Sequence, residues 1–288
     1  MKFIEPKEND FQKYKPLLSV DEMTCENSYL NAILWKNVYK YEYCLNENSL
    51  IIRFCDGEEY LYFLPLGDNF EDNVNAIIKE ENGHPIFCVS DGERFEKFKE
   101  IFGENFDCSP IPENFEYIYN RTDLAELVGK KYHQKRNHIS AFSRKYEWRY
   151  ETLTKDNICD VFAVSDEWLK EKDSEFQRDL LLENESIKNA LSHLNELSII
   201  GGIVYVGEKP VAYCFGTALN QNVFDVNIEK ALSEYQGAYA VINNEFVKRE
   251  LSSFEYVNRE DDLGIDGLRR AKLSYQPCQI LKKYIIKI

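Results

Sequence analysis

The chain has 288 residues, 44% of them apolar, and a formal net charge of −15 at pH 7. This length and apolar content suffice for a full hydrophobic core and favour two domains over one. The acidic balance argues against a general binder of nucleic acid or of an anionic membrane. Neither a signal peptide nor a run of roughly 20 apolar residues is recognisable, so we expect a soluble cytoplasmic protein.

The cysteines and histidines give no sign of a metal site. All eight cysteines stand singly, without a Cys-x-x-Cys pair. In a chain without a secretion signal, such spacing predicts reduced thiols, several of them in buried strands. The four histidines lack the spacing of metal ligands and have no nucleophilic serine or cysteine motif nearby. We therefore expect neither a metalloenzyme nor a hydrolase.

The first 120 residues predict paired strands followed by alternating helices and strands. Apolar residues at helical spacing favour a helix over 28–39, and turn signals separate the three strand-like runs that follow it. The expected strands cover 41–45, 50–54, 60–64, 85–90 and 115–119, and the later helices cover 70–81 and 93–102. This order is typical of an α/β or α+β layered domain.

Residues 121–288 repeat this order of elements. Arg121-Thr122-Asp123 forms a good N-cap for one long basic helix. The expected strands cover 149–153, 198–206, 210–218, 222–229, 254–258 and 279–286, and the helices cover 156–171, 185–196, 238–251 and the residues from 264 onward. We predict two similar domains, 1–120 and 121–288, each a mixed sheet flanked by helices, with the active cleft in the second.

Two expected strands of the second domain carry unusual polarity. The helix between them makes strands 222–229 and 254–258 parallel neighbours, and central parallel strands are normally apolar on both faces. Asp225, Asn227 and Glu229 instead alternate with apolar residues, and Asn258 and Glu260 do the same on the next strand. Because burying unpaired polar groups costs several kcal/mol, these faces predict a polar cleft. An edge strand with one solvated face is the alternative.

The helix expected from residue 264 starts beyond the carboxyl end of its strand, where open α/β sheets bind ligands. Its apolar stripe is expected to comprise Ile265, Leu268 and Ala271, with Tyr275. Arg269 and Lys272 lie on a neighbouring face and are candidates for holding a phosphate or a developing oxyanion. Ordinary surface cations are the alternative.

Two further features suggest phosphate binding. Gly237 and Tyr239 lie at a strand-to-helix turn, which presents backbone N–H groups to an anion, although an ordinary tight turn explains them equally well. A basic island between Gly129 and Arg149 contains only one acidic residue, Glu147. Its charges lie on several sides of the helix, so the phosphates of tRNA are a candidate partner, bound by Lys131, Arg136 and His138. Docking of the helix against the acidic remainder of the chain is the alternative.

Three stretches, "KKYHQKRNHISAF", "IEKALSEYQGAYAVINNEF" and "YVNREDDLGIDGLRRAKLSYQP", resemble an uncharacterised bacterial family related to the C-terminal domain of phosphatidylglycerol lysyltransferase. The resemblance extends from about Phe11 to Lys283. It implies tandem acetyltransferase-like (GNAT-like) domains, shared with peptidoglycan-bridge aminoacyltransferases that use aminoacyl-tRNA. Two departures are visible: the glycine-rich pyrophosphate signature of CoA-dependent enzymes is incomplete at 234–239, and the given sequence lacks the membrane-spanning region of the lipid-modifying synthases.

The resemblance implies transfer of an acyl or aminoacyl group to an amine or hydroxyl of a small molecule, lipid or peptide. With aminoacyl-tRNA as donor, Asp225, Glu229 or Glu260 would accept the proton of the nucleophile, and Lys272 and Arg269 would stabilise an oxyanion or phosphate. Hydrogen bonds to the substrate are assigned to Asn227, Asn258 and Arg259. A CoA-dependent N-acyltransferase that holds acetyl-CoA at Gly237 and Tyr239, and a non-catalytic binding module, are the alternatives. No cofactor is certain.

Overall fold

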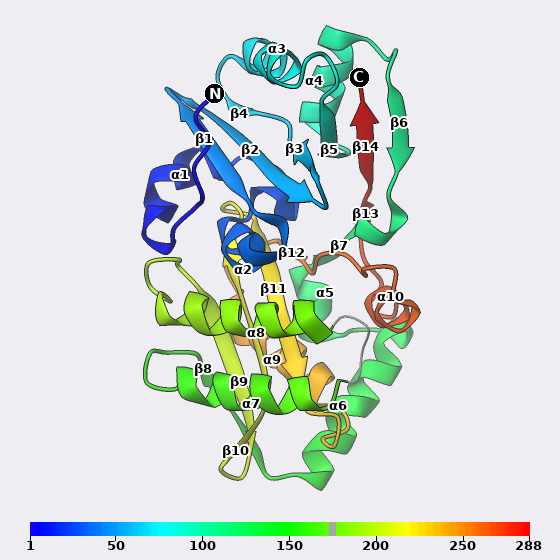
Figure 1. Ribbon diagram of the computed structural model, residues 1–288. Coiled ribbons are helices and arrows are strands. Elements are labelled where there is room, and N and C mark those ends of the chain that lie inside the picture. The colour runs from blue at the N-terminus through cyan, green and yellow to red at the C-terminus, as the bar shows by residue number, and fades with distance from the viewer. Residues whose placement is uncertain (173–176) are drawn as a thin grey trace.

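The computed structural model describes residues 1–172 and 177–288 and contains two mixed sheets flanked by helices (Figure 1). The strand order of the first sheet is β1-β2-β3-β5-β14-β6, with β4 paired to β2. Its strands are β1 (Glu42–Asn46), β2 (Ser49–Asp56), β3 (Glu59–Tyr62), β4 (Leu66–Gly67), β5 (Ile86–Ser90), β6 (Asp107–Pro110) and β14 (Lys283–Lys287). The expectation of two mixed sheets flanked by helices is confirmed.

The second sheet has the order β13-β7-β12-β11-β10-β9-β8. Its strands are β7 (Glu116–Asn120), β8 (Trp148–Thr152), β9 (Ile200–Val206), β10 (Lys209–Ala218), β11 (Val223–Ala231), β12 (Tyr256–Asn258) and β13 (Gln279–Leu281). The helices are α1 (Phe11–Leu18), α2 (Tyr29–Tyr39), α3 (Phe70–Glu80), α4 (Glu93–Phe102), α5 (Arg121–Glu126), α6 (His133–Lys145), α7 (Ile158–Lys170), α8 (Gln177–Ser192), α9 (Ala238–Glu250) and α10 (Asp266–Leu273). No helix of the described residues is long and apolar enough to cross a membrane.

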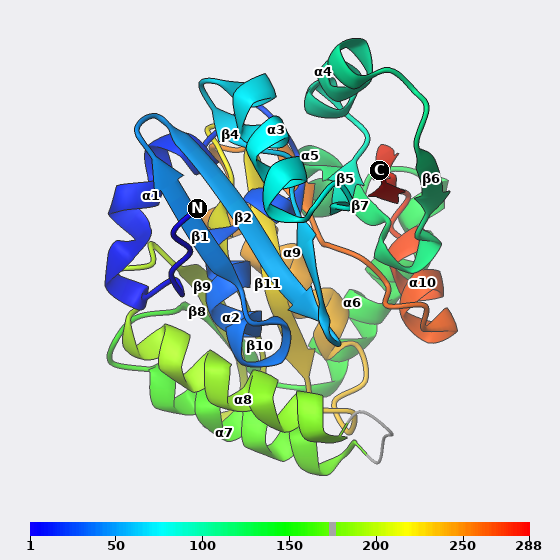
Figure 2. The same ribbon diagram turned by 45° about the horizontal axis from the view of Figure 1, so that its top comes forward.

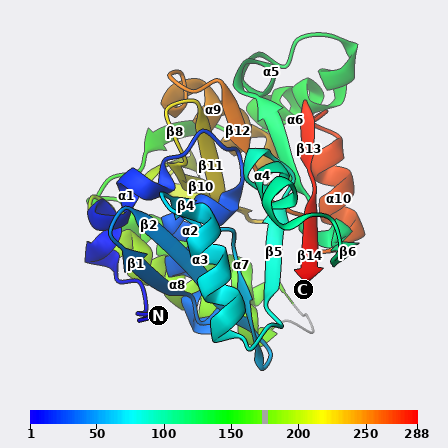
Figure 3. The ribbon, with the colours of Figure 1, turned by 90° about the horizontal axis from the view of Figure 1, so that it is seen from above.

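The chain exchanges strands between the sheets, so the sheets do not divide at the expected boundary after residue 120. Strand β7 pairs with β12 and β13 in the second sheet. The single strand expected over 279–286 is two strands: β13 belongs to the second sheet, and β14 inserts between β5 and β6 of the first (Figure 3). The C-terminal segment therefore ties the two sheets together.

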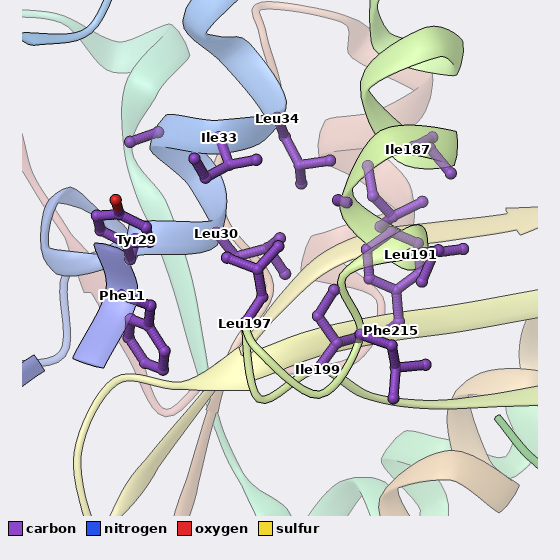
Figure 4. Packing of buried hydrophobic residues seen from close by; sticks show 14 of the residues in the cluster. Phe11, Tyr29, Leu30, Ile33, Leu34, Ile187, Leu191, Leu197, Ile199 and Phe215 are labelled. Atoms are coloured by element: carbon purple, nitrogen blue, oxygen red, sulfur yellow. The ribbon is translucent and has the colours of Figure 1, made fainter. Parts of the chain in front are cut away.

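A hydrophobic core shared by the two halves lies around α2. Ser28 caps this helix by accepting a hydrogen bond from the Asn31 backbone N–H, and Lys40 ends it in the left-handed region at φ 48°. Leu30, Ile33 and Leu34 of α2 pack against α8 and the second sheet through Ile187, Leu191, Leu197, Ile199 and Phe215 (Figure 4). Full burial of each such aliphatic side chain is worth about 1.5–3 kcal/mol.

Helices cover both faces of the second sheet. Helices α7 and α8 lie side by side on one face (Figure 2) and join the core around α2. Helix α9 packs with α6 on the other face, against Val204, Cys214 and Phe224.

The expectation of one long basic helix from residue 121 is wrong. Helix α5 ends at Glu126 because the next residue, Leu127, is left-handed at φ 50°, and Gly129 follows at φ 92°. A short 3-10 turn over Lys130–Tyr132 then leads into α6. The guanidinium of Arg136 donates to the carbonyls of Leu127 and Gly129, so this cation stabilises the break.

Candidate functional site

The site lies where the parallel pairing of β11 and β12 ends. The last paired residues are Asp225 and Asn258, which confirms that these strands are parallel neighbours inside the second sheet. Beyond this pair the strands separate, and side chains bridge the gap. The amide of Asn227 donates to Glu260 Oε1 at 3.2 Å, and Arg259 Nη2 donates to Glu229 Oε1 at 2.9 Å.

These polar side chains divide between the two faces of the sheet. The register of β10 and β11 shifts between Phe215 and Thr217, so β11 carries one extra residue there. Asp225 and Asn227 face α2, where Asn227 donates to Ser28 Oγ at 3.1 Å. Glu229 instead accepts from Asn243 of α9 at 2.9 Å. The expectation that Asp225, Asn227 and Glu229 share one face is therefore wrong for Glu229, because the bulge reverses the alternation.

Asp225 and Glu260 form a carboxyl pair linked through Asn227, whose amide also donates to Asp225 Oδ2 at 2.9 Å. Burial, reinforced by the charge of Glu116, raises the pKa of Asp225 to about 8. Burial and the neighbouring charges of Asp225 and Asp261 hold the pKa of Glu260 well above its ordinary value. Both carboxyl groups are therefore easier to protonate than ordinary ones, and a carboxyl group with a raised pKa is suited to general acid–base catalysis near neutral pH.

The carboxyl pair is covered by the N-terminal segment rather than exposed in an open cleft. Asp225 is fully buried, and Asn258 donates to the Met23 carbonyl at 2.7 Å. Asn258 is thus a structural link between the halves. Glu260 is half-buried, so it is the member of the pair that a substrate can reach. The predicted polar cleft is closed over Asp225 because residues 23–28 fill it.

A buried ion pair lies directly behind Asn258. Glu116 of β7 and Lys283 of β14 lie 2.6 Å apart, with side chains 0% and 8% exposed. Glu116 also accepts from Thr24 Oγ1 at 2.9 Å, the Cys25 backbone N–H at 2.8 Å and Asn258. Although burial raises the pKa of Glu116, the attraction of Lys283 outweighs it and the pKa is lowered. This pair joins the two sheets, and nothing in the sequence pattern indicated it.

On the opposite face, Lys135 and Arg259 form a cation pair around the ring of Tyr275. Lys135 Nζ lies 3.7 Å and Arg259 Cζ 4.7 Å from the ring centroid. Glu229 neutralises one of these charges, and Arg259 Nη1 is buried without a hydrogen-bond partner among the described residues. Burial, together with the charge of Arg259, lowers the pKa of Lys135 to about 8. The surplus positive charge on this face of the sheet is suited to an anionic group.

Lys272 and Arg269 are occupied in holding the loop that carries Glu260. Lys272 is buried, and its ammonium donates to the carbonyls of Arg259, at 2.5 Å, and Asp261. Arg269 binds Asp262 through two hydrogen bonds of 2.8 and 2.9 Å. Glu260 itself is left-handed at φ 54°, so this loop needs such support. The geometry makes both cations positioning residues rather than free anion ligands.

The expected apolar stripe of the last helix is only partly correct. Tyr275 is buried and Leu268 is half-buried, but Ile265 and Ala271 are exposed, while Lys272 of α10 is buried. Two backbone carbonyls beneath the helix attract the Lys272 ammonium, and this pairing orients α10 in place of the apolar residues.

The turn at Gly237 is packed against α6. Gly237 has φ 95°, and a Cβ added there would lie 2.8 Å from the His138 carbonyl oxygen and 3.3 Å from Phe142 Cβ. Tyr239 accepts a hydrogen bond from Trp168 Nε1 at 3.0 Å. Helix α6 thus occupies the side of the turn toward which the Cβ would point.

Gly237→Ala is therefore expected to lower the free energy of unfolding by about 1–3 kcal/mol, from backbone strain and from displacement of α6. Gly83→Ala is the matched control, because Gly83 has a similar φ of 91° and nothing within 4 Å of its Cβ position. Urea unfolding of both variants measures the difference. Equal losses would show that α6 does not press on this turn.

The three expected tRNA contacts on the basic island differ in their surroundings. Lys131 lies 3.3 Å from Asp123, Arg136 holds the α5–α6 loop, and His138 is exposed. Within residues 1–172 and 177–288, exposed Lys130, Arg144 and Lys145 make no ion pair within 4.0 Å, so these three cations are not neutralised by docking. The described residues also contain no group of three metal-ligating side chains close enough to bind a metal ion.

Of the residues at this site, Lys135, Glu116 and Lys283 were not singled out by sequence reasoning. Lys135 stood within a run of cations, and nothing in the sequence distinguished it from the exposed ones. Glu116 and Lys283 lie in predicted strands far apart in the chain, without a shared motif.

Comparison with known proteins identifies the family. Residues 19–287 match the family described as phosphatidylglycerol lysyltransferase, C-terminal. A conserved protein of unknown function from Bacteroides thetaiotaomicron is 33% identical and superposes with a TM-score of 0.92, covering 100% of this chain and 99% of that one. L-PGS from Bacillus licheniformis is 16% identical, with a TM-score of 0.64 and coverage of 98% and 92%.

FemX shares the fold, with a TM-score of 0.59, 8% identity and coverage of 98% and 97%. The arrangement of two mixed sheets flanked by helices that was expected is confirmed, and L-PGS and FemX share this fold. With nearly the whole sequence matched, this chain belongs to the family of the phosphatidylglycerol lysyltransferase C-terminal domain.

Proposed function

We propose that this protein transfers an aminoacyl group from aminoacyl-tRNA to an amine or hydroxyl acceptor. Family and fold support an acyl or aminoacyl transferase of the phosphatidylglycerol lysyltransferase and FemX type. The observation that carries the choice is the pairing of two charged groups at the gap between β11 and β12, with the carboxyl pair of Asp225 and Glu260 on one face of the sheet and the cation pair of Lys135 and Arg259 on the other.

The chemistry required is modest because an aminoacyl ester is already activated. The acceptor nitrogen or oxygen attacks the ester carbonyl carbon, a new C–N or C–O bond forms, and the bond to the ribose oxygen breaks. The acceptor loses one proton and the ribose oxygen gains one. Half-buried Glu260 contacts the reacting atoms and transfers these protons, and buried Asp225 tunes its pKa from behind.

Two groups of cations bind different parts of the aminoacyl-tRNA donor. Exposed Lys130, in the turn before α6, and Arg144 and Lys145, at the end of α6, bind phosphates. Lys135, on an inner side of the same helix, and Arg259 bind an anionic group at the gap, either a terminal phosphate or the oxyanion of the tetrahedral intermediate. The incomplete glycine-rich signature at 234–239 disfavours the CoA-dependent alternative.

Charge reversal on α6 tests the donor. The double variant Arg144→Glu/Lys145→Glu is expected to weaken tRNA binding at least about tenfold at low salt and to reduce its salt dependence, because fewer counterions are released. The control Lys2→Glu/Lys155→Glu makes the same charge change at exposed positions outside α6. Fluorescence anisotropy with labelled tRNA measures both. Equal weakening by the two variants would remove α6 from the tRNA path.

Transfer itself is tested with tRNA that carries a labelled amino acid. The protein is expected to move the label into one component of a pool of amines, peptides and lipids faster than buffer does. The proposal is contradicted if, with every acceptor, the label leaves the tRNA no faster than it does in buffer without the protein.

A further inference from the structure

A cavity of about 180 Å³ lies between the N-terminal segment and the first sheet, outside the proposed transferase site. Its volume equals that of about six liquid water molecules. The wall includes residues 21–24 and Glu26, Ser90 with the start of α4, and Leu64 and Leu281. It combines acidic groups, hydroxyls and aliphatic side chains.

The acidic groups of this cavity greatly exceed the cations. Five carboxyl groups line it, those of Asp21, Glu22, Glu26, Asp91 and Glu93, against the single cation Arg94. Arg94 is already satisfied: it donates to Glu22 at 2.7 and 2.8 Å and to the carbonyl of Leu64 at 2.8 Å. Among the described residues, the other four carboxyl groups make no ion pair within 4.0 Å. The cavity therefore carries uncompensated negative charge.

Glu26 is the group that points to a ligand. Its residue is only 6% exposed, and Ser90 donates to Oε1 at 2.8 Å, while Oε2 accepts no hydrogen bond from the described residues. A buried carboxylate of this kind is costly unless a cation accompanies it. Burial raises the pKa of Glu26 to about 7. The positive charges of Lys283 and Arg94 oppose this rise, and the negative charge of Glu116 adds to it.

We propose that this cavity binds an organic cation with N–H donors, an alkylammonium group, with Glu26 as its buried counter-ion. Thr24 and Ser90 offer hydroxyl oxygens beside Glu26, and Met23, Leu64 and Leu281 contact the alkyl chain. The described residues bring no three metal-ligating side chains together, which disfavours a metal ion. The positive end of α4 is offset by Glu93 and Glu96 in its own first turn.

Binding of n-butylammonium tests the proposal independently of any transferase activity. NMR titration at pH 8 is expected to show saturable binding, about tenfold tighter than at pH 6, because Glu26 is mostly ionised only at the higher pH. Tetramethylammonium, which has no N–H donor, is expected to bind at least tenfold more weakly.

Glu26→Gln keeps the size of the side chain and an acceptor for Ser90, and is expected to weaken n-butylammonium binding at least tenfold at pH 8. Glu71→Gln, on the exposed face of α3, removes one charge elsewhere and serves as the control. If Glu26→Gln does not fold, the proposal is tested by two measurements on the natural protein: the pH dependence of n-butylammonium binding and the comparison with tetramethylammonium. Absence of saturable n-butylammonium binding, or equal binding of the two cations, would overturn the proposal.

Discussion

Replacing Lys283 by methionine is expected to lower the free energy of unfolding by about 3–5 kcal/mol. The substitution leaves the Glu116 carboxylate buried without its counter-ion, where burial raises its pKa and favours the protonated form. Because Lys283 belongs to the first sheet and Glu116 to the second, the substitution weakens the junction between the two halves. Denaturant unfolding measures it.

The matched control is Lys287→Met on the same strand, whose side chain is exposed and which is expected to change stability by less than about 0.5 kcal/mol. Combining Lys283→Met with Glu116→Gln removes both charges, and the double variant is expected to recover part of the loss. If Lys283→Met is no more harmful than Lys287→Met, the ion pair does not hold the sheets together.

Glu260→Gln is expected to reduce aminoacyl transfer by about 10²–10⁴-fold while making the folded protein more stable at alkaline pH. The folded-state pKa of Glu260 is raised, so its contribution to stability is full below the unfolded pKa and is lost as the pH rises. Glutamine keeps an acceptor for Asn227 and cannot ionise. The gain in unfolding free energy above neutral pH is expected to be at least about 1 kcal/mol, the equivalent of roughly one pKa unit.

Asp225→Asn distinguishes catalysis from packing at the same site. The charge of Asp225 helps to raise the pKa of Glu260, so its removal is expected to shift the pH–rate profile of transfer toward lower pH. Transfer rates and urea unfolding across pH 6–9 provide the two readouts. A Glu260→Gln variant with full activity would remove Glu260 from the reaction, and an unshifted profile in Asp225→Asn would uncouple the carboxyl pair.

The local parts of the site could be predicted from the sequence, because they depend on strand periodicity. A helix between two strands makes β11 and β12 parallel, and period-two alternation brings Asp225, Asn227, Asn258 and Glu260 together. The bulge in β11 could not be predicted, since one extra residue leaves no mark in the pattern, and it reversed the direction of Glu229.

The long-range parts of the fold could not be read from local patterns. Whether β14 would pair inside the first or the second sheet depends on partners nearly 200 residues earlier in the chain. The burial of Lys272 and Lys283 depends on acceptors supplied by distant segments, and a sequence alone ranks such lysines as exposed. The break between α5 and α6 depends on the left-handed backbone of Leu127, which leucine rarely adopts.

The donor is tested most directly by titrating the natural protein with bulk aminoacyl-tRNA, deacylated tRNA and acetyl-CoA at about 50 and about 200 mM salt. We expect aminoacyl-tRNA to bind, with an affinity that falls steeply at the higher salt, and acetyl-CoA not to show saturable binding. Binding of acetyl-CoA without binding of either tRNA would contradict the account and make the protein a CoA-dependent N-acyltransferase. Binding of none of the three would contradict it in favour of a non-catalytic module.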